Sequence, residues 1–302
     1  MKNPKNFYER SQGEFLTPNK SGIFHRLIFM KYAKMFGYVF LILGLFVSSS
    51  IAGTLIVGTV YLLKAEVVTM SAENIASIIA DNVLLSSILS SLITMLLYWV
   101  VFLFRKRSLG SYSLPQRIPL SYIGISLLIG LCFSFTITGF ISVAGIERYF
   151  PDHQVLIQSV LLGKGFWLPL LGVGILAPIV EEVAFRGLIF NRMREDISLK
   201  AALILQAIFF GAIHLNMLQS SYAFIIGLFL GIGYVWTNSL YVPILMHIGL
   251  NSTSVLMAQI PQIESNAIVL FSMFVIGFTL LLIITKVFKK QTKQPLLKSA
   301  EY

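Results

Sequence analysis

Charged residues are scarce in this sequence. Asp, Glu, Lys and Arg make up 12% of its 302 residues, whereas an average soluble protein is about 25% charged. This deficit excludes an ordinary soluble domain and an intrinsically disordered chain, and the mean hydropathy of +0.82 points to a membrane protein. The net charge of +10 does not indicate a nucleic-acid partner, because the basic residues lie between long apolar runs rather than on one polar face.

Cysteine and several other features are also nearly or wholly missing. The single cysteine, Cys132, lies inside an apolar run, which excludes an internal disulfide framework. The sequence shows no internal repeat, low-complexity tract or soluble domain. We also expect no cleavable signal peptide, because the first apolar run is too long for the core of such a signal.

Long apolar runs dominate what is present. A transmembrane helix needs about 20 apolar residues, with a range of roughly 17–25. We therefore predict an all-α, polytopic integral membrane protein with about eight transmembrane helices. The predicted spans are residues 35–63, 82–104, 118–146, 165–180, 201–217, 222–236, 242–257 and 268–284.

The charge of the connecting segments predicts the orientation. Basic segments alternate with neutral or acidic ones along the chain, as the positive-inside rule requires. Eight spans then place both termini in the cytosol, and we expect the protein in the plasma membrane. Residues 22–36 mix basic and apolar side chains, which is compatible with an interfacial helix on the inner leaflet or with a solvated basic tail.

The spans group into four predicted regions. These are a basic cytosolic tail with that interfacial helix, three N-terminal transmembrane helices, a catalytic helical core, and a last transmembrane helix with a basic cytosolic tail. They cover residues 1–34, 35–150, 151–258 and 259–302.

Ionisable residues inside the apolar runs are confined to one part of the chain. They are Glu181, Glu182, His214 and His247, and with Asn251 they fall on four consecutive predicted helices. A charged side chain at mid-bilayer costs roughly 2.5–3.5 kcal/mol on insertion scales. Such residues mark a functional site by default.

Spacing predicts different roles for the two glutamates. Neighbours on a helix point about 100° apart, so Glu181 and Glu182 should not aim at one spot. Glu182 and Arg186 are four residues apart, with the acid first, which favours an ion pair. Glu181 is then left to face something else. The alternative is that both carboxylates lie in headgroup water at the end of the fourth span.

The remaining polar positions follow helical spacing. Phe210 lies one turn before His214 and could hold its ring by packing. His247 and Asn251 share one helix face, which indicates either a site or a helix–helix hydrogen bond.

Two glycines on the sixth predicted span suggest close helix packing. Gly227 and Gly231 are four residues apart, and such a flat strip lets another helix backbone approach.

This set of side chains suits water activation and peptide hydrolysis. A carboxylate can act as a general base, and histidine and asparagine N–H groups can stabilise an oxyanion. Glu181, His214 and His247 could instead bind a divalent metal such as zinc. A metal-independent mechanism fits equally well, and the His-Glu-x-x-His pattern of soluble zinc proteases is absent.

Four motifs together resemble a known family. They are Glu-Glu-x-x-x-Arg from Glu181, Phe-x-x-x-His ending at His214, Phe-x-x-Gly-x-x-x-Gly ending at Gly231, and His-x-x-x-Asn from His247. In this order they resemble the CPBP (Abi) family of intramembrane CAAX prenyl proteases and bacteriocin-processing enzymes. The resemblance covers about residues 166–255.

The resemblance implies an all-helical intramembrane protease whose cavity opens toward the cytosol. It implies that Glu181 and His214 activate water, and that His247 and Asn251 serve the oxyanion or the polar wall. Supporting roles fall to Glu182, Arg186, Phe210, Gly227 and Gly231.

We therefore expect an intramembrane endopeptidase of the glutamate or metallo type. Its partners would be the lipid bilayer and a peptide or membrane-protein substrate, in bacteriocin immunity, peptide maturation or signalling. Two alternatives stay open. One is a non-catalytic toxin-immunity or binding protein on the same scaffold, and the other is a small transporter that uses the polar stripe as an ion path.

Overall fold

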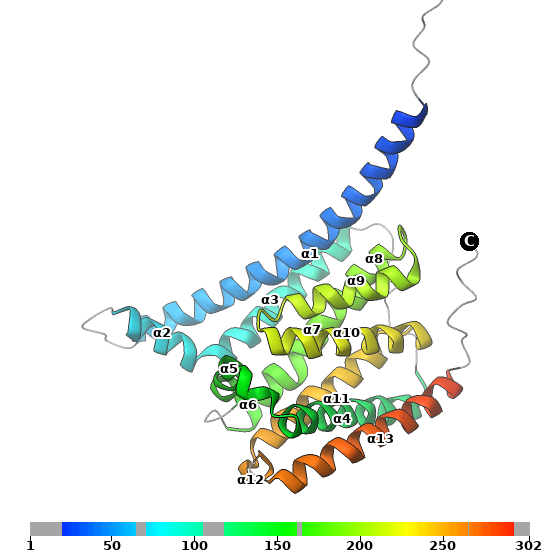
Figure 1. The fold of residues 1–302 in the computed structure, drawn as a ribbon. Helices are drawn as coiled ribbons and strands as arrows, with labels where there is room; N and C mark the ends of the chain where they lie inside the picture. Colours follow the sequence, from blue (N-terminus) through cyan, green and yellow to red (C-terminus); the bar gives the residue numbers. More distant parts are fainter. Residues whose placement is uncertain (1–19, 65–70, 105–117, 162–164, 265, 293–302) are drawn as a thin grey trace, which may run out of the picture.

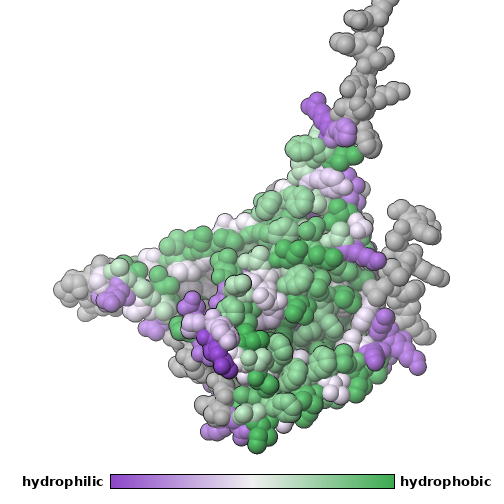
Figure 2. Space-filling model, in the orientation of Figure 1, coloured by the Kyte–Doolittle hydropathy of each residue, from purple (hydrophilic) through white to green (hydrophobic). Residues whose placement is uncertain are grey.

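A computed structural model describes residues 20–64, 71–104, 118–161, 165–264 and 266–292. Every regular element in these ranges is a helix, which confirms the predicted all-α class (Figure 1). Hydrophobic residues cover most of the face shown in Figure 2, and hydrophilic residues gather near the ends of the bundle. Large apolar side chains such as Phe40, Trp99 and Phe271 are exposed, as a lipid-facing surface requires.

The N-terminal helices differ from the prediction in length. α1 (Lys20–Lys64) is continuous over 45 residues, so residues 22–36 are helical and lead without a break into the first predicted span. It packs on α3 (Val83–Phe104), and the short α2 (Ala72–Asp81) lies between them in the chain. α4 (Leu120–Val143), η2 (Ile146–Tyr149) and α5 (Pro151–Leu161) follow.

The fourth predicted span is longer than expected. It is one uninterrupted helix over Trp167–Met193, which we call the central helix. It is built from α6 (Trp167–Pro169), the π-helix η3 (Leu170–Leu176), α7 (Ala177–Glu182), the π-helix η4 (Val183–Phe190) and α8 (Asn191–Met193). The predicted end at residue 180 was wrong, because the charged residues that follow are paired inside the bundle and do not end the helix.

The C-terminal half supplies the remaining helices. They are α9 (Leu199–Ala212), α10 (Met217–Thr237), α11 (Tyr241–Ala258), α12 (Pro261–Glu264) and α13 (Ala267–Gln291). All eight predicted segments are helical, and seven of the described helices are long and apolar enough to cross a membrane. The protein is therefore a multi-pass membrane protein. The 14-residue α9 is about 21 Å long, which is short against a hydrocarbon core of about 30 Å.

Close helix contacts hold the bundle together. α4 packs against both α11 and α13, and Gly130 and Gly249 let the backbones of α4 and α11 touch. Figure 1 shows the beginning of α1 and the end of α13 on the same side of the bundle.

Candidate active site

Glu182 is the centre of a buried polar network. It ends α7 and its exposed fraction is 0%. Its Oε1 accepts a hydrogen bond from Arg186 Nη1 at 2.8 Å and another from His247 Nδ1 at 2.9 Å. The predicted ion pair is therefore present. The alternative, in which both glutamates lie in headgroup water, was wrong.

Arg186 connects Glu182 to two other helices, α9 and α10. Its Nη2 donates to the Gly227 carbonyl at 2.8 Å, and Gln206 Nε2 donates to the same oxygen at 2.9 Å. Its guanidinium lies 4.7 Å from the centroid of the Phe210 ring. A buried charge is tolerated when it is paired and hydrogen-bonded. We call the set Glu182, Arg186, Gln206, Gly227 and His247 the Glu182 network.

Gln206 is a member of the network that the motifs do not include, although its exposed fraction is 0%. The available signal was a glutamine in an otherwise apolar run, one turn before Phe210. Its side chain binds the Gly227 carbonyl on another helix. A contact with a main-chain carbonyl of a distant segment cannot be predicted from a residue pattern.

The glycine strip of α10 faces α9. A Cβ at Gly227 would lie 3.1 Å from a ring carbon of Phe210, and one at Gly231 would lie 2.9 Å from a methyl carbon of Leu203. The predicted close approach of another helix is confirmed, and that helix is α9. The contact also brings the Gly227 carbonyl within reach of both Arg186 and Gln206.

Glu181 points away from the Glu182 network except at one place. Its Oε2 is buried without a hydrogen bond among the described residues, and it lies 3.8 Å from His247 Nε2. His247 thus has Glu182 at one ring nitrogen and Glu181 near the other. Helical spacing predicts that the two carboxylates point in different directions. They still approach the same side chain, because the imidazole ring of His247 has two nitrogens and each carboxylate lies near one of them.

Asn251 binds the central helix one turn further along α11. Its Nδ2 donates to the Val173 carbonyl at 3.0 Å, and the neighbouring Ser252 hydroxyl donates to the Gly174 carbonyl at 3.2 Å. Both carbonyls belong to the π-helix η3, and π-helical segments are frequent at functional sites. Of the two alternatives, Asn251 therefore makes a helix–helix hydrogen bond, while His247 faces the carboxylates.

His214 lies just beyond α9, whose C-cap is Ile213. Its Nδ1 donates to the Phe210 carbonyl at 2.8 Å, which leaves the lone pair of the ring on Nε2. The Phe210 ring contacts the imidazoles of both His214 and His247, with centroids 5.3 and 5.7 Å apart. Leu215 follows with a φ of +53° and an exposed fraction of 94%, a strained turn of the kind found beside functional residues.

The three residues that could bind a metal by their chemistry, Glu181, His214 and His247, do not form a metal site in the described structure. Among the described residues, no three His, Cys, Asp or Glu side chains lie close enough to hold a metal ion. His247 is bound by Glu182, and His214 is turned toward the Phe210 carbonyl. This arrangement does not fit a metal centre.

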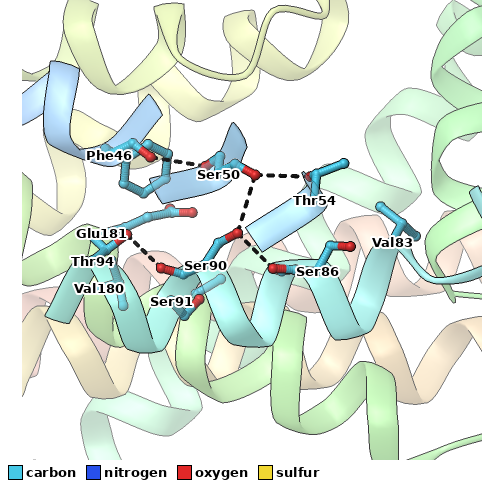
Figure 3. Close-up of a pocket in the computed structure, with 12 residues that line it drawn as sticks. Phe46, Ser50, Thr54, Val83, Ser86, Ser90, Ser91, Thr94, Val180 and Glu181 are labelled. Carbon is cyan, nitrogen blue, oxygen red and sulfur yellow. Dashed lines mark hydrogen bonds between the residues drawn. The ribbon is translucent and has the colours of Figure 1, made fainter. Parts of the chain in front are cut away.

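A cavity of about 250 Å³ lies between α1, α3 and α7. Figure 3 shows the Glu181 carboxyl group directed into the space between α1 and α3. Among the described residues that line the cavity, Glu181 is the ionisable one, and serine and threonine side chains form much of the wall. These hydroxyl groups could not be identified from the sequence, because isolated serines and threonines are common in transmembrane runs.

Comparison with known proteins supports the resemblance. Residues 163–253 match the family described as Type II CAAX prenyl endopeptidase Rce1-like, and this range contains all four motifs. The resemblance to CAAX-type intramembrane peptidases is thereby confirmed for this segment. No solved structure matches the chain.

A curated relative extends the same similarity. Over 143 residues the chain is 27% identical to a protein of Bacillus subtilis (strain 168) named "Putative membrane peptidase YdiL". The aligned stretch covers 45% of this chain and 57% of that protein. The chain thus spans little more than half the length of this relative.

Proposed function

We propose that the protein is an intramembrane endopeptidase that hydrolyses a peptide bond of a membrane-associated or peptide substrate. One observation carries the proposal. Glu181 faces a cavity with a carboxylate free of hydrogen bonds among the described residues, while its neighbour Glu182 is fixed by two partners. The similarity of residues 163–253 to CAAX prenyl endopeptidases supports the same activity.

In the proposed reaction, Glu181 acts as the general base. Water donates a proton to its carboxylate as the water oxygen bonds to the carbonyl carbon of the substrate. The carbonyl becomes a tetrahedral oxyanion, the bond from carbon to nitrogen then breaks, and the leaving amine takes the proton back. The water is consumed, and Glu181 returns to its starting state.

The other motif residues have proposed roles around this base. Glu182 fixes the ring of His247 through Nδ1 and so aims Nε2 toward Glu181. His214 offers the lone pair of Nε2 for a proton. Asn251 keeps a second amide hydrogen that can serve an oxyanion. Arg186 balances the charge of Glu182 and acts as a positioning residue.

The proposed setting is the plasma membrane, with both termini in the cytosol. The alternation of basic and acidic segments supports this orientation, as does the common side of the outer ends of α1 and α13 in Figure 1. The proposed roles are peptide maturation, signalling or self-immunity to a bacteriocin.

Terminomic mass spectrometry of cells that express matched amounts of the wild type or Glu181→Gln tests the activity. We expect new peptide termini in wild-type membranes or medium that are missing with Glu181→Gln, because an amide cannot accept the proton of water. Glu195→Gln is the matched control, since Glu195 pairs with Arg192 at the partly exposed end of the central helix. It should keep the wild-type termini.

Two results would contradict the proposal. Termini that persist with Glu181→Gln would remove the general base from its role. Protection of cells against a toxic peptide by folded Glu181→Gln as effectively as by the wild type would favour a non-catalytic binding or immunity protein.

A further inference from the structure

Hydroxyl groups line the cavity beside Glu181. Seven of its lining residues are serines or threonines, two from α1 and five from α3. Neither helix belongs to residues 163–253, the segment that matches the peptidase family. The cavity therefore joins the proposed general base to a part of the chain that the family comparison does not explain.

Four of these hydroxyls donate their hydrogens within their own helices. Thr54 and Ser50 donate to carbonyls four residues earlier on α1, at 2.9 and 3.0 Å. Thr94 and Ser90 do the same on α3, each at 2.7 Å. The Ser90 hydroxyl also makes a longer contact of 3.4 Å with the Ser50 carbonyl on α1 (Figure 3). A hydroxyl that donates to its backbone keeps lone pairs for other donors. The wall therefore presents mainly hydrogen-bond acceptors to the cavity.

Two further serines of α3, Ser86 and Ser91, also belong to the wall. They are largely buried, with exposed fractions of 4% and 8%. Burial of a hydroxyl group without a hydrogen bond lowers the stability of the folded protein. A bound molecule that can both donate and accept hydrogen bonds would therefore stabilise the serine hydroxyls of the wall.

The size of the cavity suits water. A volume of about 250 Å³ is room for roughly eight molecules at about 30 Å³ each. Water is retained where a cavity is polar and supplies two to four partners, and the hydroxyls and Glu181 meet that condition. Peptide hydrolysis also consumes one water molecule per bond, which has to reach Glu181 through an apolar bundle.

We propose that the cavity between α1 and α3 holds a cluster of water molecules that supplies the nucleophile to Glu181. The inference rests on the proposed function for the use of that water, although not for its presence. An acceptor wall binds water through its hydrogens and leaves an oxygen lone pair directed away from the wall. This is the orientation that attack on a carbonyl carbon needs. α1 and α3 thereby become positioning elements of the reaction.

Cysteine accessibility tests whether the cavity is wet, without any need for activity. Cys132→Ala first removes the native thiol, and Ser91→Cys or Ser126→Cys is then introduced. Ser126 is the matched control, because it is fully buried on α4 and does not line the cavity. A small charged methanethiosulfonate added to open membrane fragments should label Ser91→Cys at least about tenfold faster than Ser126→Cys, because a thiolate forms readily only in contact with water. Equal, slow labelling of both would overturn the proposal.

Kinetics with the peptide whose cleavage requires Glu181 test the use of the water. Ser91→Val and Ser91→Thr have similar volumes and differ in the hydroxyl. We expect Ser91→Val to lower kcat by about tenfold relative to Ser91→Thr, with the same KM, as the loss of one hydrogen bond in the transition state would do. A change confined to KM would identify the cavity as a substrate subsite and overturn the proposal.

The two proposals fail in different ways. If no cleavage depends on Glu181, the proposed function fails, and the labelling of Ser91→Cys still decides whether water occupies the cavity. If Ser91→Val does not fold, the same labelling experiment still decides the question.

Discussion

Two polar regions lie next to each other inside this apolar bundle, and Glu181 stands at their border. The Glu182 network contains full charges, and each has partners on at least one other helix. The cavity between α1 and α3 contains hydroxyls, and these bond mainly within their own helices. The difference follows from the cost of burial, which is far higher for a charge than for a hydroxyl.

The contrast explains why the Glu182 network is rigid and why a cavity can form between α1 and α3. A buried charge fixes its neighbours, because every partner that moves away leaves it unpaired. Hydroxyls that satisfy themselves inside a helix make no such demand, so two helices can separate around a cavity. A site that needs both fixed supporting residues and room for reactants can use one region for each purpose.

Removal of Arg186 should have the largest effect. Arg186→Met leaves Glu182 as a buried, unpaired carboxylate, and we expect the free energy of unfolding to fall by about 3–5 kcal/mol. Steric trapping in lipid bicelles measures it. The control is Arg192→Met, because Arg192 pairs with Glu195 and Asp196 at a partly exposed position, and its loss should cost less than about 1 kcal/mol. Equal losses for the two variants would remove the distinction between the network and an ordinary ion pair.

The two neighbouring glutamates should separate stability from activity. Glu182→Gln weakens two charged hydrogen bonds, and we expect it to lower the free energy of unfolding by about 1.5–3 kcal/mol. Glu181→Gln changes a group without hydrogen bonds in the described residues, and its effect should stay within about 0.5 kcal/mol. The same bicelle measurement checks both. A large loss with Glu181→Gln would show that Glu181 belongs to the rigid region.

Substitution of a glycine in α1 should destabilise the protein at Gly53 but not at Gly58. A Cβ at Gly53 would meet the hydroxyl of Ser90 and the backbone of α3, whereas one at Gly58 would find ordinary contact distances. We expect Gly53→Ala to cost about 1–3 kcal/mol through overpacking. Gly58→Ala should instead raise stability by up to about 1 kcal/mol through helix propensity. Thermal unfolding in detergent measures both variants. Equal shifts of the melting temperature would mean that α1 and α3 can move apart freely.

Loss of a cavity hydroxyl should have the smallest effect. Ser90→Ala removes a hydroxyl that donates to the Ser86 carbonyl of its own helix at 2.7 Å and lies only 3.4 Å from the Ser50 carbonyl of α1. The Ser86 carbonyl keeps its helical hydrogen bond, so we expect a change in the free energy of unfolding below about 1 kcal/mol. Thermal unfolding in detergent checks the result. A loss as large as that of Glu182→Gln would show that the hydroxyls hold the bundle together, and the comparison would fail.

Spacing along one helix was the most informative part of the sequence. The interval of four residues predicted the pair of Glu182 and Arg186, and the interval between Gly227 and Gly231 predicted a close helix contact. Both are present. The ion pair depends on the geometry of one helix, whereas spacing places the two glycines on one face and only packing decides that this face meets α9. The end of the central helix was placed wrongly, because a charge in a transmembrane run was taken as a boundary. Only its partners on other helices make that charge acceptable.

Composition, hydropathy and motif spacing by themselves determined that this chain is a helical membrane protein and that its polar residues gather on a few helices. Tertiary structure decided the rest. It brought Glu182 to His247 across 65 residues, gave Arg186 and Gln206 the Gly227 carbonyl, and opened a hydroxyl-lined cavity beside Glu181. The physical reason is that a periodic pattern fixes which face of a helix is polar, while the packing of neighbouring helices fixes what that face meets.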